Sequence, residues 1–214
     1  MKRAVWFVSV AVVVIASVAL AAPRQPPGRD ARIRRGEYLV TVGGCNDCHT
    51  PWKMGPNGLT QDMSRMLSGH PEILAMPAAP QVSSPWGASV AGTFTAWAGP
   101  WGVSFTANLT PDPETGLGSW TVQNFIETMR TGRHMGRGRP ILPPMPWFNY
   151  GKMTDEDLKA TFAYLQSIPP IKNRVPAPIP PAEGADAQPA AGGMQPRGGA
   201  EGSVGAGGSS QPGR

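Results

Sequence analysis

Cys45-Asn46-Asp47-Cys48-His49 is the stretch of this 214-residue chain that decides its fold. It contains the only two cysteines of the sequence, in the spacing Cys-x-x-Cys-His. This spacing lets two thiols form thioethers to the two vinyl groups of a haem while the next residue ligates the iron. The stretch therefore predicts one covalently bound haem c, attached through Cys45 and Cys48, with His49 as an iron ligand.

Other functions of two such cysteines fit this sequence less well. A thioredoxin-type redox pair begins a helix in a βαβ unit, whereas residues 33–42, just before the motif, have a helical pattern. A zinc site needs further Cys or His ligands, and only His70 and His134 remain in the chain. A structural disulfide would close a loop of only two residues and would be strained.

The N-terminus predicts export. Met1-Lys2-Arg3 is positively charged, residues 4–22 are almost wholly apolar, and Ala19-Leu20-Ala21 fits a cleavage site. We expect a signal peptide over residues 1–21 and a periplasmic protein, which agrees with haem attachment outside the bacterial inner membrane. A retained membrane anchor is the alternative, because the apolar run approaches the roughly 20 residues that span a bilayer.

Composition divides the remaining chain. Of its 25 prolines and 27 glycines, many fall in residues 175–214, which contain no aromatic residue. Such a segment buries too little apolar surface to offset its ordering entropy, so it is predicted to be a disordered tail. We expect residues 22–30 to be a linker and residues 31–174 to form a single domain with one haem.

The net charge of the chain does not indicate a partner, but one segment is strongly basic. Residues 22–174 contain 15 Lys+Arg and 11 Asp+Glu. Arg130, Arg133, Arg137 and Arg139, with His134 among them, form a basic run without an acid. The run is either a solvated loop or a group of charges that compensates a haem propionate or faces an acidic partner. Export argues against nucleic-acid binding by these arginines.

Three helices are predicted from apolar periodicity and from their caps. The first spans residues 30–44, the second follows Thr121 or Ser119 and ends at Gly132, and the third begins at Thr154 and stops before Pro169. A glycine in the first helix, Gly36, would let the first and last helices cross closely beside Tyr164 or Phe162.

The residues between the motif and Thr110 differ from the helices, since they are rich in Trp, Gly, Pro and Ser. We expect a long loop insertion that wraps one haem edge and limits its contact with water, which raises the potential. Alternation predicts a short β-hairpin near residues 93–107. Residues 61–68 are expected to form a single helical turn.

The second axial ligand of the iron is predicted to be Met145. Prolines on both sides, Pro144 and Pro146, stiffen this loop, and a stiff loop can hold a weak thioether bond. A Met ligand also raises the potential. Four other residues remain as alternatives: His134, Met135, His70 and Met76.

Taken in order, these motifs resemble the class I cytochromes c. More narrowly, they resemble haem domains in the cytochrome subunits of membrane-bound bacterial alcohol and aldehyde dehydrogenases, over residues 31–174. The resemblance implies an all-α fold, haem c on Cys45 and Cys48, His49 as proximal ligand and Met145 as distal ligand. The chain departs from those subunits in having one haem motif where they have three. The segments that carry the resemblance are Cys45–His49, Asn108-Leu109-Thr110-Pro111-Asp112, Gly116-Leu117-Gly118, Trp120, Pro144-Met145-Pro146 and Thr154-Asp155-Glu156-Asp157-Leu158.

Ligands on both faces of the iron leave no open position for a substrate, so we expect an electron-transfer protein and not an enzyme. The hypothesis is a monohaem cytochrome that passes single electrons in the periplasm between a dehydrogenase and a respiratory acceptor. The alternatives are a haem-based gas or ligand sensor with five-coordinate iron, or a non-catalytic haem subunit of a dehydrogenase complex. Redox proteins are the expected partners, with membrane association only through an uncleaved N-terminal segment.

Two further contacts of the haem are predicted. We expect the ring N–H of His49 to reach a backbone carbonyl near Gly55-Pro56, because this segment follows at short range. Asn108, Thr110 and Trp101 are candidates for contacts with the propionates.

Overall fold

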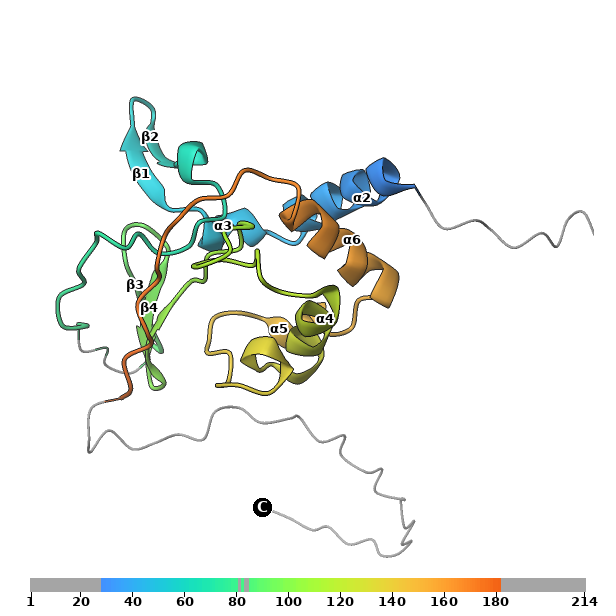
Figure 1. Cartoon of the computed structure of the whole chain (residues 1–214). Helices are drawn as coiled ribbons and strands as arrows, with labels where there is room; N and C mark the ends of the chain where they lie inside the picture. Colours follow the sequence, from blue (N-terminus) through green and yellow to red (C-terminus); the bar gives the residue numbers. More distant parts are fainter. Residues whose placement is uncertain (1–27, 81, 83–84, 182–214) are drawn as a thin grey trace, which may run out of the picture.

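The computed structural model describes residues 28–80, 82 and 85–181 (Figure 1). The predicted signal peptide and residues 182–214 of the predicted tail lie outside this range, and the domain limits stay a prediction. The order of elements is α2 (Arg29–Val42), α3 (Cys45–His49), β1 (Trp52–Gly55), β2 (Gly58–Gln61), the 3-10 turn η1 (Met63–Arg65), β3 (Ser89–Val90), β4 (Ala96–Gly99), β5 (Gly102–Phe105), α4 (Val122–Thr131), the 3-10 turn η2 (His134–Gly136), α5 (Trp147–Tyr150) and α6 (Asp155–Leu165).

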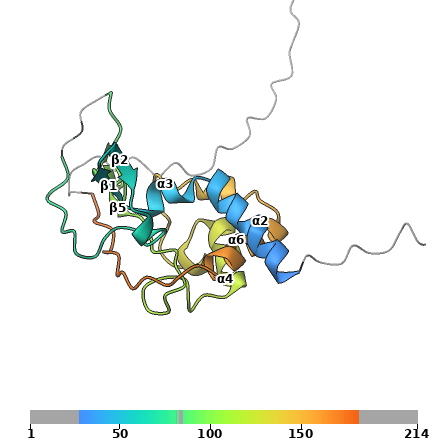
Figure 2. The same cartoon turned by 90° about the horizontal axis from the view of Figure 1, so that it is seen from above.

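The elements form two groups on either side of α3. Helices α2, α4, α5 and α6 gather on one side of this short helix, and the five strands lie on the other side (Figure 1). The view from above shows the same division (Figure 2). The haem motif, which is α3 itself, therefore lies where the helical group meets the strands.

The close crossing of α2 and α6 depends on Gly36. A Cβ atom placed on this residue would lie 2.0 Å from the carbonyl oxygen of Ala160 and 2.7 Å from Cβ of Tyr164. Only a residue without a side chain fits there, which confirms the predicted crossing beside Tyr164. Arg35 and Asp157 form a salt bridge of 2.9 Å next to it. Because half of the Arg35 side chain is exposed, the pair adds little stability.

The predicted helix caps of α4 and α6 are confirmed. The hydroxyl of Thr121 accepts from the backbone N–H of Asn124, whose side chain in turn accepts from the N–H of Thr121, so α4 begins with a capping box. It ends at Gly132, whose φ of 65° is the left-handed conformation that glycine adopts readily. The hydroxyl of Thr154 accepts from the N–H of Asp157 and starts α6.

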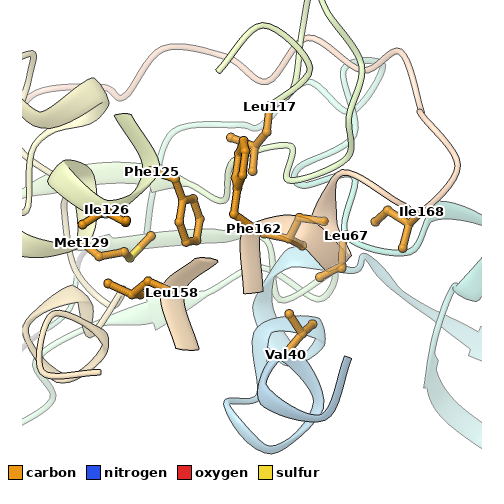
Figure 3. Packing of buried hydrophobic residues seen from close by; sticks show 10 residues of the cluster. Val40, Leu67, Leu117, Phe125, Ile126, Met129, Leu158, Phe162 and Ile168 are labelled. Atoms are coloured by element: carbon orange, nitrogen blue, oxygen red, sulfur yellow. The ribbon is translucent and has the colours of Figure 1, made fainter. Parts of the chain in front are cut away.

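One hydrophobic cluster joins the helices to the loops around the motif (Figure 3). The rings of Phe125 from α4 and Phe162 from α6 lie 5.4 Å apart at its centre, and Val40 from α2 and Leu67 from the insertion are almost fully buried. Burying such side chains contributes roughly 1.5–3 kcal/mol each. We call this set the core cluster: Val40, Leu67, Leu117, Phe125, Ile126, Met129, Leu158, Phe162, Leu165 and Ile168.

The expected all-α fold is wrong. The described residues contain five strands in two antiparallel sheets, β1–β2 and β3–β4–β5, all within the predicted loop insertion. The β4–β5 pair is the hairpin predicted near residues 93–107, and η1 is the predicted helical turn. The β1–β2 hairpin was not predicted, although Asn57-Gly58 is a hairpin signal and Gly58 has φ of 102°.

The chain after α6 runs back from the helices to the strands (Figure 1). Asn173 is 1% exposed, and its side-chain amide donates to the carbonyls of Ser68 and His70 while its oxygen accepts from Arg65 and from the N–H of Glu72. Farther on, Ile179 exchanges two backbone hydrogen bonds with Val103 of β5. The segment thus holds the β part against the helical part.

In the part of the chain that the structure describes, no helix has the length and apolar character needed to cross a membrane.

We expect the Gly36→Ala variant to lose about 1–3 kcal/mol of unfolding free energy, because the added methyl group would push α2 away from α6. Urea denaturation of the haem-loaded protein would measure this loss. Gly92→Ala is the control, since a Cβ there meets nothing within 4 Å. Equal stability of the two variants would contradict the close crossing.

Candidate functional site

The haem motif forms a helical turn of its own. Gly44, which follows α2, has a left-handed φ of 65° that turns the chain, and α3 begins after it. Cys45, Cys48 and His49 are at positions i, i+3 and i+4 of this turn, so their side chains share one face of the helix. This face presents two sulfurs and an imidazole together.

The two thiols are free and protonated at neutral pH. They form no disulfide. Burial raises the pKa of the Cys45 thiol to about 11, and burial together with the charge of Asp47 raises the pKa of Cys48. A redox or nucleophilic cysteine needs a lowered pKa. The surroundings of these thiols therefore disfavour thioredoxin-type chemistry.

The imidazole of His49 is held in one tautomer. Its Nδ1 lies 2.7 Å from the carbonyl oxygen of Ala107, and because a carbonyl only accepts, Nδ1 carries the proton. Nε2 is then the nitrogen with a free lone pair, the form that ligates a metal. The residue is 8% exposed, and burial lowers its pKa, although the bond to Ala107 partly offsets this. The ring stays neutral at pH 7.

The predicted acceptor near Gly55-Pro56 is wrong. These residues form the end of β1 and the turn to β2, and the acceptor lies 58 residues away from His49 instead. Short separation in sequence was the only basis for the prediction, and the hairpin carries that segment to other contacts. No residue type marks Ala107 as an acceptor, because the group involved is a backbone carbonyl.

Thr50 fastens the end of the motif to the insertion. Its hydroxyl donates to the side chain of Asn46 at 2.7 Å and accepts from the N–H of Leu67 at 2.9 Å. The N–H of Gly69 donates to the carbonyl of His49. Thr50 is fully buried, so these bonds are shielded from water and fix the backbone next to the imidazole.

The loop that carries Met145 packs near the haem motif and is held by hydrogen bonds of the residues around it. Met145 is partly buried and packs against the core cluster, as Cys45 does. Ser104 of β5 donates to the carbonyl of Pro143, and the N–H of Trp147 donates to the carbonyl of Met145. The loop is therefore held from both the strand side and the helix side.

Tyr150 joins this loop to the motif and was missed in the sequence. Its hydroxyl donates to the carbonyl of Gly43, at the junction of α2 and α3. A Cβ atom on Gly43 would lie 3.3 Å from the Tyr150 ring and 3.8 Å from Sγ of Cys45. Burial, and then the nearby thiols, raise the pKa of the tyrosine. Helix α5, which begins two residues after Met145, thus contacts the junction of α2 and α3, next to Cys45.

The four alternative ligands differ in their surroundings. His70 is fully buried, and both ring nitrogens are bonded, Nδ1 to the hydroxyl of Thr95 and Nε2 to the carbonyl of Leu74. Met76 lines a pocket of about 90 Å³ between residues 76–80 and the strands. His134 is exposed, and the centroids of its ring and of the Trp120 ring lie 5.1 Å apart, with the two ring planes nearly perpendicular. Met135 has a left-handed backbone within η2.

The candidates for propionate contacts are bonded within the protein. The amide of Asn108 donates to the carbonyl of Ile171, and its oxygen accepts from the N–H and the hydroxyl of Thr110. The indole N–H of Trp101 donates to Ser104. In this structure the Asn108 and Thr110 groups hold the segment after α6.

We expect His70→Gln to flatten the decrease in stability at acidic pH. Burial lowers the pKa of His70, so below about pH 6.5 the unfolded chain takes up a proton that the folded chain does not, and unfolding becomes easier as pH falls. The measurement is urea denaturation between about pH 7 and 5. The unaltered protein, measured in parallel over the same pH range, is the reference.

The haem absorption spectrum of His70→Gln should stay that of the unaltered protein, since the His70 ring is engaged in structural bonds. Loss of the low-spin spectrum would show that His70 is an iron ligand.

Comparison with known proteins agrees with this geometry. No protein-family model matches the chain. It is 27% identical over 164 residues to the gluconate 2-dehydrogenase cytochrome c subunit of Pantoea cypripedii and 25% identical over 174 residues to the alcohol dehydrogenase (quinone) cytochrome c subunit of Gluconobacter oxydans. It is also 29% identical over 162 residues to a subunit of the nicotinate dehydrogenase of Pseudomonas putida.

These matches cover most of the chain but a small part of each relative. They take in 76%, 81% and 73% of this chain, in the order given, and only 29%, 29% and 10% of the relatives. Two of these three relatives are named as cytochrome c subunits of dehydrogenases. The chain is a cytochrome c-type relative of the cytochrome c subunits of bacterial dehydrogenases.

Proposed function

We propose that the chain is a monohaem c-type cytochrome that carries single electrons in the periplasm. The observation that carries the proposal is the face of α3, where two free thiols lie beside an imidazole whose Nδ1–H is bonded to Ala107. The sequence contains one such motif. One haem c per chain is therefore the cofactor that these residues fit.

The residues present suit a covalently attached haem. Cys45 and Cys48 would form the thioethers, and their neutral, partly buried thiols are compatible with an apolar macrocycle beside them. His49 would be the proximal ligand through Nε2. Its bond to the carbonyl of Ala107 fixes the ring orientation and makes the imidazole a stronger donor.

Met145 is proposed as the distal ligand. It packs against the same core cluster as Cys45, and α5, which follows it, reaches the corner of α2 and α3 through Tyr150. Two of its four rivals are less suited, because the nitrogens of His70 are both bonded and Met76 lines a pocket on the strand side. A thioether ligand raises the reduction potential.

The mechanism needs little movement of the protein. A bound haem supplies a one-electron iron couple. His49 and Met145 would both ligate the iron of a bound haem, and two protein ligands would keep small molecules away from the metal. The buried core cluster and the returning segments around Leu67 exclude water, which favours the state of lower charge.

The proposed partners are redox proteins. Relatives named as dehydrogenase cytochrome c subunits suggest that the chain receives electrons from a periplasmic or membrane dehydrogenase and gives them to a respiratory acceptor. Service as a haem subunit within such a complex is the nearest variant of this proposal. The predicted export signal supports a periplasmic location, with or without an N-terminal anchor.

The first test is the haem content of the chain purified from the periplasm. We expect a pyridine haemochrome assay and intact mass to give one covalent haem per chain, and Cys45→Ala/Cys48→Ala to give none. A chain that carries no covalent haem would sink the proposal.

The second test replaces the distal sulfur. In Met145→Ala the spectrum should change from low spin to high spin, and the midpoint potential should fall by a sizeable fraction of the roughly 0.8 V range that axial ligands span. Spectroelectrochemistry measures both changes. Met54→Ala is the matched control, because that methionine is 76% exposed on the β1–β2 hairpin.

An unchanged spectrum in Met145→Ala would exclude Met145 as a ligand. An unaltered protein that is already five-coordinate and binds carbon monoxide rapidly would favour the sensor function instead.

A further inference from the structure

The loop between α4 and Met145 carries a concentrated positive charge. From Thr128 to Thr154 the sequence has four arginines, one lysine and no aspartate or glutamate. Three of the arginines, Arg133, Arg137 and Arg139, lie in residues 133–139, which we call the arginine loop. Residues 22–174 as a whole contain only four more basic than acidic residues, so this segment is unusual within the chain.

The backbone of the arginine loop is closed by its own hydrogen bonds. Arg133 pairs with Pro140 as an antiparallel bridge, and the N–H of His134 donates to the carbonyl of Arg139 at 3.0 Å. The N–H of Ile141 donates to the carbonyl of Gly132 at 2.8 Å, which ties the loop to the end of α4. The arginines therefore project from a defined framework.

Their charges are not neutralised within the part of the chain that the structure describes. Arg130, at the end of α4, forms a salt bridge of 2.7 Å with Asp155. Arg133, Arg137 and Arg139 are exposed and take part in none of the described salt bridges. Arg133 and Arg139 donate only to backbone carbonyls.

One carboxylate borders the loop. Oε2 of Glu127 lies 2.8 Å from the position that a Cβ atom would take on Gly136, and its Oε1 accepts from Gln123. With three arginines and this one bordering carboxylate, the loop keeps a net positive charge. Burial and the nearby Arg139 lower the pKa of His134, so His134 adds no charge at neutral pH.

The loop lies beside the proposed distal ligand. Residues 140–144 lead from it directly to Met145, and the ring of His134 packs on Trp120, which contacts the core cluster. Beyond Met145, Phe148 is 55% exposed. Along the chain, Met145 is therefore flanked by unpaired arginines on one side and an exposed aromatic ring on the other, and both residue types are enriched in protein interfaces.

We propose that the arginine loop is the docking surface for the electron-transfer partner, and that the partner presents clustered carboxylates to it. This inference rests on the proposed function and names the chemistry of the partner. Opposite charges steer the encounter and raise the association rate. Docking at this loop also brings the partner next to the Met145 side of the haem.

Small redox reagents of opposite charge test the field at this surface. In the assay the reduced holoprotein gives one electron to hexacyanoferrate(III), an anion, or to tris(phenanthroline)cobalt(III), a cation, and stopped-flow absorbance gives the rate constant. At low ionic strength we expect R133Q/R137Q/R139Q to react at least about threefold more slowly with the anion and faster with the cation. The difference should vanish at high salt.

The matched control removes the same charge from α2. R29Q/R32Q/R34Q loses three arginines from a helix that is separated from α4 by α6 (Figure 1). We expect this variant to change the two rate constants much less. Equal effects of the two triple variants, or no effect of either, would overturn the proposal, because net charge alone or another surface would then control the encounter.

A macromolecular probe tests the kind of partner. Poly-L-glutamate should slow the reaction of the unaltered protein with hexacyanoferrate(III) and have little effect on R133Q/R137Q/R139Q. Arginine-dependent binding to phosphatidylglycerol vesicles without an effect of polyglutamate would overturn the proposal in favour of a membrane surface.

Failure of this inference is distinguishable from failure of the proposed function. Each variant is first checked for one covalent haem, an unchanged absorption spectrum and an unchanged urea denaturation midpoint. A chain without haem defeats the proposed function, whereas a normal holoprotein that is indifferent to the three arginines defeats only the docking surface.

Discussion

The hydrogen bond between His49 and the carbonyl of Ala107 is the constraint around which the rest of the structure is arranged. It joins residues 58 positions apart, so the chain after the motif has to leave α3, form its strands and return. Two more hydrogen bonds, from the N–H of Leu67 to Thr50 and from the N–H of Gly69 to His49, also join the insertion to the end of the motif. The insertion is therefore part of the site, since it sets the tautomer of the imidazole and keeps water away from it.

The helices position the loop that carries Met145 through one contact, at the junction of α2 and α3. Gly36 lets α2 cross α6 closely, and α2 ends at Gly43, where the hydroxyl of Tyr150 is bonded. Tyr150 follows Met145 by five residues. The junction of α2 and α3, where the haem motif begins, therefore also holds the loop that carries the methionine. Shifts of the helices would therefore move both proposed axial ligands together, which suits a centre that has to keep its geometry in two oxidation states.

Charge is divided between the inside and the outside of the molecule. The imidazole of His49 and the thiol of Cys45 are uncharged at neutral pH, because burial lowers the pKa of His49 and raises that of Cys45. The unpaired arginines near Met145 are exposed. Charge kept at the surface costs little desolvation and can act on a partner at a distance, whereas the same charge in the core would need compensation.

The sequence by itself determined the features that depend on neighbouring residues: the haem motif, the caps at Thr121 and Thr154 and the β4–β5 hairpin. It also predicted one distant contact, the crossing at Gly36, because a glycine within a helix indicates a close approach. It did not predict two sheets beside the helices, and Asn57-Gly58 was the one overlooked signal. Only the tertiary structure decided that Ala107 accepts from His49, that the nitrogens of His70 are engaged and that Tyr150 meets the motif. These contacts join distant segments, often through backbone carbonyls. Because every residue carries a backbone carbonyl, no pattern of side chains in the sequence predicts them.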